Sequence, residues 1–394
     1  MSGVQLSDSR LASRMHDIAP FRVMGILARA KSLEGSGHDV VHMEVGEPDF
    51  PAPAAVIKAA HQALTAGATH YTPAVGLSDL REAVSSYYSK RFGVAVDPRR
   101  IVITPGASGA LQLVLGILIN AGDCVLLQDP GYPCNRHMVS MFGGDPNSLP
   151  LMPEGIDAQK VLDVVDAQTK ALMLASPANP TGEVIPLEEL TAIYQGLELD
   201  SQFMIVDEIY QGLEYGRSPV TALSLGEKGL FVINSFSKFF GMTGFRVGWV
   251  VAPGEYVEPL ERLAQNLFLA PSTIAQHAAL AVFDEAVLAE LDHRRSIFEQ
   301  RRNQLHAGLR SLGFDLPDVP PQGAFYLYAG LNGLASSGEI FADQLLRLQH
   351  VAVTPGVDFG FQGTRDHVRF AYTTTNERIE EGLRRIQTYL EAGG

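Results

Sequence analysis

The chain has 394 residues, of which 46% are hydrophobic, and a formal net charge of −14 at pH 7. This length and apolar content predict an ordered globular protein with either two domains or one large domain and a smaller partner. The acidic balance excludes nucleic acid as an expected partner, because phosphate backbones are bound by clustered lysine and arginine. No run approaches the ~20 apolar residues of a membrane span. Only Cys124 and Cys134 are cysteines, so we expect a soluble, cytoplasmic protein with no membrane contact.

The elements predicted for the first hundred residues are mostly helical. Apolar residues recur there at the spacing of a helix, and proline or glycine marks the breaks. In chain order the pattern predicts a polar arm at residues 1–20, a helix from Phe21 to about Ala30, a strand at 40–45, a proline-rich loop at 46–51, and helices at 54–64 and 78–92.

From Ile101 onward, short apolar strands alternate with helices. This alternation predicts an α/β fold with a mostly parallel sheet that is covered on both faces. The predicted strands are 101–104, 125–128, 171–175, 203–206, 230–233 and 247–251, and a helix at 110–119 follows the first of them. Polar clusters follow the strands closely, at 129–132, 176–182, 207–210 and 235–238. Because the carboxyl ends of parallel strands form the ligand site of such sheets, we expect these clusters to meet there.

After about residue 285 the pattern predicts a second, smaller α+β domain. Its elements are a charged helix at 291–312, a segment at 323–328, a helix at 339–350, a strand at 367–372, and a last helix from about Thr374, where Glu377 completes a capping box, to Leu390. We place the large domain at residues 45–288. The small domain combines residues 16–44 with 289–394.

The segment 235–246 lies between two predicted buried strands and contains Lys238. Removing an ammonium group from water is costly and lowers its pKa toward the nucleophilic free amine. Hydroxyl groups, glycines and Arg246 in the same segment could hold a phosphate. The combination suggests pyridoxal 5'-phosphate, although solvated loop charges would explain this segment if it stood alone.

Other residues offer matching chemistry. Ala107 and Ser108 stand at a predicted helix start, where backbone N–H groups can hold a phosphate. Asp207 ends an apolar strand, and its carboxylate could pair with a pyridinium nitrogen. Tyr132 could stack on a ring, and the guanidinium fork of Arg369 suits a carboxylate. Taken singly, each has an ordinary structural explanation as a turn, a cap, a packing contact or a salt bridge.

Other catalytic patterns are incomplete in this chain. Ser235 and Lys238 have the spacing of a serine acylase, but the companion motifs of that class are absent. The segment 106–110 lacks the second glycine of a nucleophile elbow. His38 and His42 would share a face only on a helix, and their run is predicted as a strand. We therefore expect no metal site.

A series of short motifs occurs in order along the chain. They are Gly46-Glu-Pro-Asp-Phe, Tyr71, Pro105-Gly-Ala-Ser-Gly-Ala-Leu111, Asp129-Pro-Gly-Tyr132, Ser176-Pro-Ala-Asn-Pro-Thr-Gly182, Asp207-Glu-Ile-Tyr210, Ser235-Phe-Ser-Lys238, Gly244-Phe-Arg246 and His367-Val-Arg369. As an ordered set they resemble the class I/II aminotransferases of fold type I, in the branch with bacterial aspartate-type and alanine-type enzymes. The likeness runs from about Pro20 to Ile386.

The resemblance implies a cofactor site for pyridoxal phosphate. Lys238 would hold the cofactor covalently and later move the proton of the substrate α-carbon. Asp207 would pair with the ring nitrogen, Tyr132 would stack on the ring, and Asn179 and Tyr210 would hydrogen-bond its hydroxyl group.

The resemblance also implies phosphate and substrate contacts. The phosphate would be bound by Ala107, Ser108, Ser235 and Arg246, together with Tyr71 of a neighbouring subunit, which implies a homodimer. Lys238, Asp207 and Tyr71 are thus the predicted catalytic residues. The α-carboxylate of the substrate would be bound by Arg369, Asn179 and the backbone of Gly46.

The implied activity is transfer of an amino group between an L-amino acid and a 2-oxo acid by a ping-pong mechanism. In dicarboxylate-specific members a second cation meets the distal carboxylate, but the segment 266–272 of this chain contains no arginine or lysine. We therefore predict a preference for neutral or aromatic donors over aspartate. A C–S β-lyase or another pyridoxal phosphate enzyme on this fold is the alternative, and a non-catalytic ligand sensor is a more distant one.

Overall fold

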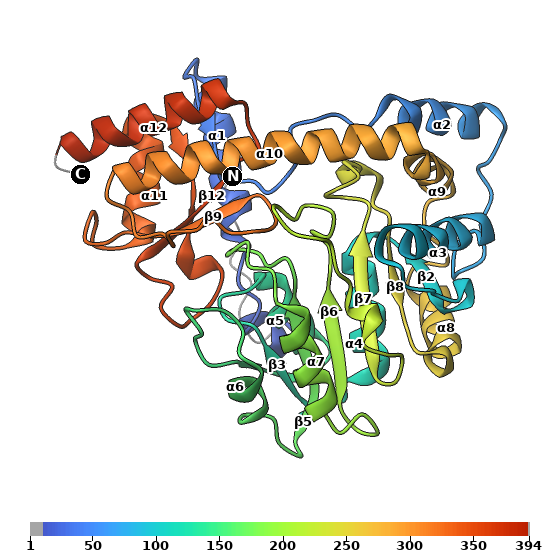
Figure 1. The fold of residues 1–394 in the computed structure, drawn as a ribbon. Coiled ribbons are helices and arrows are strands. Elements are labelled where there is room, and N and C mark those ends of the chain that lie inside the picture. The colour runs from blue at the N-terminus through green and yellow to red at the C-terminus, as the bar shows by residue number, and fades with distance from the viewer. Residues whose placement is uncertain (1–10, 393–394) are drawn as a thin grey trace.

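The centre of the molecule is a seven-stranded sheet with strand order β2-β8-β7-β6-β5-β3-β4 (Figure 1). The structure is a computed structural model that describes residues 11–392. β8 is antiparallel to both of its neighbours, and the other pairings of this sheet are parallel. The strands are β2 (Ile101–Thr104), β3 (Cys124–Leu127), β4 (Asp145–Ser148), β5 (Thr169–Ala175), β6 (Phe203–Asp207), β7 (Leu230–Ser235) and β8 (Gly248–Val251). The predicted α/β fold with a mostly parallel sheet is confirmed.

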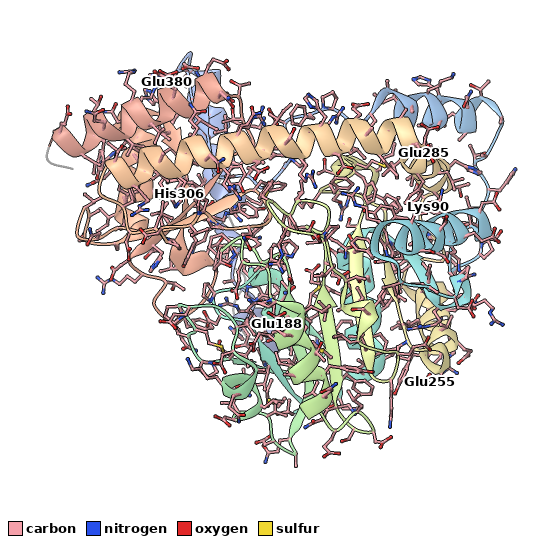
Figure 2. All side chains as sticks on the ribbon, viewed as in Figure 1. Lys90, Glu188, Glu255, Glu285, His306 and Glu380 are labelled. Carbon is pink, nitrogen blue, oxygen red and sulfur yellow. The ribbon has the colours of Figure 1, made fainter. Side chains whose placement is uncertain are left out.

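Both faces of this sheet are buried, which explains why its central strands are apolar along their whole length. Alternate residues of β5 belong to different core clusters, Leu172 to one and Met173 to the other. α7 (Leu187–Gly196) contributes to the first cluster and α4 (Gly106–Leu118) to the second. These two helices lie on opposite sides of the sheet in Figure 1, and side chains fill the space between the layers (Figure 2).

The other helices of this part of the chain surround the large sheet. They are α2 (Ala54–Thr65), α3 (Ser78–Phe92), α5 (Pro133–Met141), α6 (Ala158–Leu162), α8 (Val257–Leu267) and α9 (Thr273–Leu280). Among them, α2 packs mainly on α9. The helices predicted at 54–64 and 78–92 are therefore confirmed.

A second group of elements surrounds a three-stranded antiparallel sheet of order β11-β12-β9. Its members, with a separate parallel pair β1-β10, are α1 (Arg22–Gly35), β1 (Val41–His42), β9 (Tyr326–Gly330), α11 (Gly338–Gln349), β10 (Val351–Ala352), β11 (Thr354–Pro355), β12 (His367–Ala371) and α12 (Asn376–Glu391). This mixture of helices and antiparallel strands agrees with the α+β content predicted for the C-terminal part.

The long helix α10 (Glu285–Ser311) connects the two groups of elements. It runs from the side of α9 to the side of α12, and Glu285 and His306 lie toward its two ends (Figures 1 and 2). The predicted domain boundary at residue 288 falls in the first turn of this helix, so the domain limits stay a prediction.

Three elements differ from their predicted limits because of side-chain or backbone hydrogen bonds. α10 begins at Glu285 rather than near 291, since the Asp284 side chain caps it by accepting a hydrogen bond from the N–H of Ala286. α12 is capped by Thr375, not Thr374. The predicted strand at 40–45 is paired only at Val41–His42, because the backbone of Met43 then bonds both Ala352 and Ala371.

Two further differences arise from residues that are weak indicators of secondary structure. α4 begins at Gly106 instead of Ala110, and Gly106 has the left-handed φ of +69° that favours glycine. Strand β4 was not predicted, because its sequence Asp-Pro-Asn-Ser is typical of a turn. Pro146 is tolerated there since β4 is the edge strand of the sheet.

The N-terminal arm is described only in part. Residues 1–10 of the predicted arm lie outside the described residues, and Ser13–His16 form a short 3-10 helix. Within residues 11–392, no helix has the length and apolar character needed to cross a membrane.

Candidate active site

A cavity of about 290 Å³ lies where β5, β6 and β7 end and α4 begins. It is lined by residues from the large sheet, from the loop after β1 and from β9 and β12. Nearly all of the predicted site residues line it, namely Gly46, Ala107, Ser108, Tyr132, Asn179, Asp207, Tyr210, Ser235, Lys238, Arg246 and Arg369. The folding of both halves of the chain is therefore needed to build this site.

Lys238 follows β7 and points its amine into the cavity. The Nζ atom donates a hydrogen bond to the carbonyl oxygen of Gly46 at 2.6 Å. Burial lowers the pKa of Lys238 to about 8, and the nearby carboxylate of Glu47 opposes that shift. Arg369 and Arg246 add to the lowering by charge repulsion. About a tenth of this amine is consequently unprotonated at pH 7, far more than for an ordinary lysine with a pKa near 10.4, and the free amine is the form that a nucleophile or a base requires.

Asp207 is the last residue of β6 and is only 5% exposed. Its Oδ1 accepts a hydrogen bond from the N–H of Ile209 at 3.0 Å. Burial raises the pKa of Asp207 to about 6, and the Ile209 hydrogen bond opposes that rise. The carboxylate is therefore mainly ionised at pH 7, although no ion pair to it is found among residues 11–392. A cationic ring nitrogen in the cavity would supply the partner that a buried carboxylate needs.

Arg369 is a buried cation without a carboxylate partner in the described chain. It is 2% exposed, and its guanidinium lies between the rings of Tyr326 and Phe359, at 4.3 and 4.6 Å from their centroids. Its Nη1 and Nη2 donate to Asn179 Oδ1 and the Glu44 carbonyl, whereas Nε is buried with no partner. Because an uncompensated buried charge is costly, this arrangement favours an anionic ligand.

Tyr326 is a site residue that the sequence did not reveal. Its hydroxyl lies 2.8 Å from the hydroxyl of Tyr210, and its ring supports Arg369. A Cβ atom on Gly46 would lie 1.6 Å from the Tyr326 hydroxyl oxygen, so the Gly46 position admits only glycine. The predicted segment 323–328 contained Tyr326, but no local pattern distinguished it from a core aromatic.

The residues predicted to bind a phosphate lie together at one end of the cavity, which we call the anion end. Arg246 has a left-handed backbone with φ of +55°, and its Nη1 donates to Ser237 Oγ at 3.3 Å. A Cβ atom on Gly106 would lie 2.4 Å from Arg246 Nη2, so glycine at the start of α4 lets the guanidinium approach Ala107 and Ser108. No ion pair of Arg246 occurs within residues 11–392. A helix start, hydroxyls and an unpaired guanidinium together suit an anion.

Tyr71 is the predicted residue that does not reach the cavity of its own chain. Its side chain is 84% exposed, and it is not among the lining residues. Sequence reasoning also missed the apolar contribution of the N-terminal region, where Phe21, Val23 and Met24 line the cavity. Their helical spacing was recognised, but spacing alone does not say which face of α1 meets a ligand.

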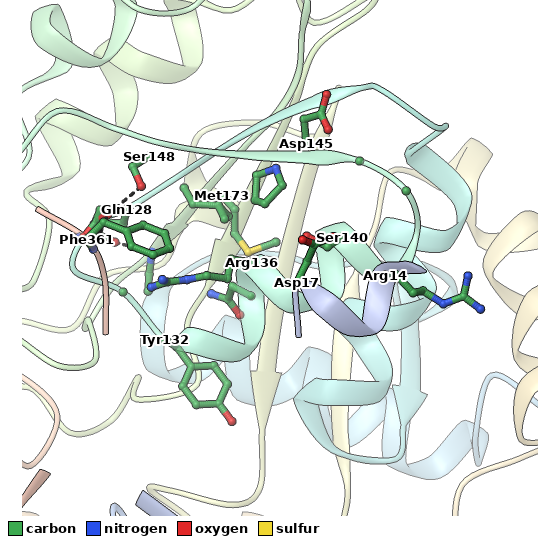
Figure 3. A pocket seen from close by; sticks show the side chains of 18 of the residues that line it. Arg14, Asp17, Gln128, Tyr132, Arg136, Ser140, Asp145, Ser148, Met173 and Phe361 are labelled. Atoms are coloured by element: carbon green, nitrogen blue, oxygen red, sulfur yellow. Dashed lines mark hydrogen bonds between the residues drawn. The ribbon is translucent and has the colours of Figure 1, made fainter. Parts of the chain in front are cut away.

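A second cavity of about 580 Å³ lies on the other side of Tyr132 and shares Tyr132 and Ala175 with the first (Figure 3). The guanidinium of Arg136 lies 4.5 Å from the centroid of the Phe361 ring there. Figure 3 shows the ring of Tyr132 pointing away from Arg136 and Phe361. The Tyr132 ring therefore belongs to the cavity that contains Lys238.

The family model described as "Aminotransferase class I and II" matches residues 38–386 of this chain. This chain belongs to the class I and II aminotransferases. The match includes the Lys238, Asp207 and Arg369 positions that meet in the cavity, and the protein is accordingly a transaminase.

Relatives of the aminotransferase match it over nearly its whole length. The (5-formylfuran-3-yl)methyl phosphate transaminase of Methanocaldococcus jannaschii is 35% identical over 382 residues, which are 96% of this chain and 99% of that protein. The valine–pyruvate aminotransferase of Mycobacterium tuberculosis is 35% identical over 376 residues, covering 95% and 97%. Other relatives are named as aspartate and aromatic-amino-acid aminotransferases.

A solved structure confirms the architecture of the aminotransferase. The crystal structure of an aminotransferase from Mycobacterium tuberculosis superimposes with a TM-score of 0.92 at 35% identity, covering 97% of this chain and 99% of that one. The fold described above is thus fold type I.

Proposed function

We propose that this aminotransferase binds pyridoxal phosphate through Lys238 and moves an amino group between a neutral or aromatic L-amino acid and a 2-oxo acid. The mechanism is ping-pong, so the first 2-oxo acid leaves before the second one binds. The observation that carries the proposal is that Lys238, Asp207 and Arg369 line one cavity. A buried lysine amine, a buried carboxylate and a buried guanidinium with no carboxylate partner among the described residues are the groups that this chemistry needs.

The residues present fit pyridoxal phosphate. When bound, the cofactor supplies an electron-accepting ring that stabilises negative charge at the substrate α-carbon. Asp207 would keep the ring nitrogen protonated, and Tyr132 would lie against the ring. Asn179 and Tyr210 would hydrogen-bond the ring hydroxyl.

The anion end of the cavity would hold the phosphate. Ala107, Ser108, Ser235 and Arg246 supply backbone N–H groups, hydroxyls and a guanidinium there. At the opposite wall, Arg369 would bind the substrate α-carboxylate, and its partner Asn179 fixes the orientation of the guanidinium fork.

Lys238 would anchor the cofactor covalently and then carry the α-proton. Its hydrogen bond to the Gly46 carbonyl holds the amine beside the residues that bind the carboxylate. We expect the cofactor-free protein to take up pyridoxal phosphate faster as pH rises and to reach a plateau above about pH 8, because the pKa of Lys238 is lowered to about 8. Stopped-flow absorbance measures this rate. A rate that keeps rising to pH 10 would indicate an ordinary lysine.

The donor preference is supported by the lining of the cavity. Among the described residues, its cations are Lys238, Arg246 and Arg369, and each already has a role in the proposal. The remaining wall includes apolar side chains from α1, and Glu47 would repel a second carboxylate.

The visible spectrum of the purified protein tests the proposal as a whole. We expect a coloured protein whose absorbance changes when single amino acids are added, with a higher kcat/KM for alanine, leucine or phenylalanine than for aspartate. A colourless protein that fails to bind pyridoxal phosphate contradicts the cofactor. A much higher kcat/KM for aspartate contradicts only the preference. Release of ammonia and pyruvate from cystathionine as the main reaction would favour the β-lyase alternative.

We also propose a homodimer in which Tyr71 reaches the phosphate of the partner's site, since it is exposed and remote from its own cavity. Mixing Lys238→Ala subunits with Tyr71→Ala subunits should restore activity, because the mixed dimer contains one complete site. Random exchange would restore about a quarter of the sites. Failure to restore activity, with subunit exchange shown by native mass spectrometry, would place Tyr71 in its own site. A cytoplasmic location stays a prediction.

A further inference from the structure

Glu208 is a buried carboxylate that lies directly beside Asp207 in sequence but does not line the cavity. Its Oε1 accepts a hydrogen bond from the N–H of Ala222 at 2.6 Å. Its Oε2 accepts from Gln211 Nε2 at 2.8 Å and from Thr221 Oγ1 at 2.9 Å. Both carboxyl oxygens are therefore occupied by donors, and the proposed chemistry uses neither of them.

A line of hydrogen bonds leads from this carboxylate to the cavity. Gln211 Oε1 accepts from Asn234 Nδ2 at 3.0 Å, and Asn234 Oδ1 accepts from the backbone N–H of Ser235 at 2.7 Å. Glu208, Gln211, Asn234 and Ser235 are each at most 3% exposed. Because water does not reach these groups, each amide depends on its protein neighbours for its hydrogen bonds.

The direction of the bonds in this line is fixed from both ends, by the Glu208 and Val220 acceptors that face Gln211 and by the Ser235 N–H that faces Asn234. Burial raises the pKa of Glu208 to about 8, and in either protonation state its Oε2 can accept the hydrogen that the NH₂ of Gln211 donates. The second hydrogen of that NH₂ goes to the carbonyl of Val220 at 3.0 Å. The oxygen of Gln211 then faces the NH₂ of Asn234, which leaves the Asn234 oxygen to accept from Ser235. Glu208 thus acts with the Val220 carbonyl and the Ser235 N–H to hold two buried amides in one orientation.

The line of hydrogen bonds ends at the anion end of the cavity. Ser235 Oγ donates to Ser237 Oγ at 2.9 Å, and Arg246 Nη1 donates to the same Ser237 oxygen at 3.3 Å. Ser235, Ser237 and Arg246 all line the cavity. A change in the Ser235 backbone would therefore move groups assigned to the phosphate.

We propose that Glu208 is a positioning residue that orients the phosphate-binding wall through Gln211, Asn234 and Ser235. This inference rests on the proposed cofactor site. Glutamine at position 208 is isosteric, but it has one acceptor oxygen. Its NH₂ must therefore oppose either the fixed N–H of Ala222 or the NH₂ of Gln211. The first conflict cannot be relieved by rotation. Relieving the second one by turning Gln211 would direct its oxygen at the Val220 carbonyl, so it would cost another hydrogen bond of the line.

The test compares two ligands, pyridoxal phosphate and pyridoxal, which lacks the phosphate. The Kd of pyridoxal divided by the Kd of pyridoxal phosphate measures how much the anion end of the cavity contributes to affinity for the cofactor. In Glu208→Gln we expect this ratio to fall about five- to ten-fold, the worth of one well-aligned hydrogen bond. Gln211→Met, which interrupts the line at another position, should lower the ratio by a similar factor. The double variant should lose no more than either single one, because both changes break the same line.

Thr221→Val is the matched control, since it removes a hydrogen bond to the same Oε2 atom but leaves the line to Ser235 intact. We expect its ratio to equal that of the wild type, even if its Tm falls. The inference is overturned if Glu208→Gln leaves the ratio unchanged, weakens both ligands equally, or acts no more strongly than Thr221→Val. If Glu208→Gln does not fold, the ratio of Gln211→Met is the test, and a ratio equal to that of the wild type or of Thr221→Val overturns the inference. A wild type that binds neither ligand would instead contradict the proposed function.

Discussion

Replacing Lys238 by alanine should lower kcat by about 10⁴-fold, because one change would remove both the proposed covalent anchor and the group proposed to move the α-proton. The Lys238→Ala protein should still bind pyridoxal phosphate noncovalently, since Asp207, Tyr132 and the anion end of the cavity remain. The measurements are steady-state transamination, and mass spectrometry after borohydride reduction to detect a cofactor attached to the chain.

Lys228→Ala provides a control for the loss of a lysine. Lys228 lies outside the cavity and pairs with Asp200 at 2.6 Å on the surface. Its removal should leave kcat and cofactor attachment unchanged. A Lys238→Ala variant that turned over with the kcat of the wild type would show that the nucleophile has been misassigned.

Replacing Arg369 by lysine should lower kcat/KM for an L-amino acid by about 100-fold or more, the expected cost of breaking the buried, hydrogen-bonded charge pair that we propose between Arg369 and the substrate α-carboxylate. Lysine keeps the positive charge but loses the planar fork and its stacking between Tyr326 and Phe359. The reaction of the matching primary amine, which has no carboxylate, should change little. The informative quantity is therefore the ratio of the two kcat/KM values.

Arg301→Lys is the matched control for Arg369. Arg301 is also a buried arginine, and it forms a bidentate pair with Asp49 at 2.7 and 2.9 Å outside the cavity. We expect Arg301→Lys to lower Tm while leaving the ratio of amino acid to amine unchanged. If both arginine variants changed that ratio equally, Arg369 would have a structural role only.

The sequence predicted the large sheet because its signals are local. Continuous apolar runs such as Leu230–Ile233 mark strands that are buried on both faces, and the helices between them mark parallel connections. Boundaries were less accurate where a single hydrogen bond decides them, as at Asp284 before α10 and Thr375 before α12. Strand β4 could not be found because its stability comes from pairing with β3 and not from its own residues.

The candidate site was largely predictable in its residue types. Lys238, Asp207 and Arg246 each follow or precede a strand of the large sheet, and strand ends of such a sheet meet at one edge. The partners of these residues could not be predicted in the same way. Tyr326 meets Tyr210 across 116 residues of chain, and Arg369 meets Asn179 across 190. No local pattern encodes such contacts.

The sequence by itself thus determined the class of fold, the positions of the polar clusters after the predicted strands, and the kinds of side chain available to a cofactor. Only the tertiary structure decided that Arg369 is buried with no anionic partner among residues 11–392, that Tyr71 lies outside its own cavity, and that Glu208 connects to Ser235 through Gln211 and Asn234. The physical reason is that periodicity and residue type depend on neighbours in the chain. Burial, pairing and the direction of a hydrogen bond depend on segments that meet only after folding.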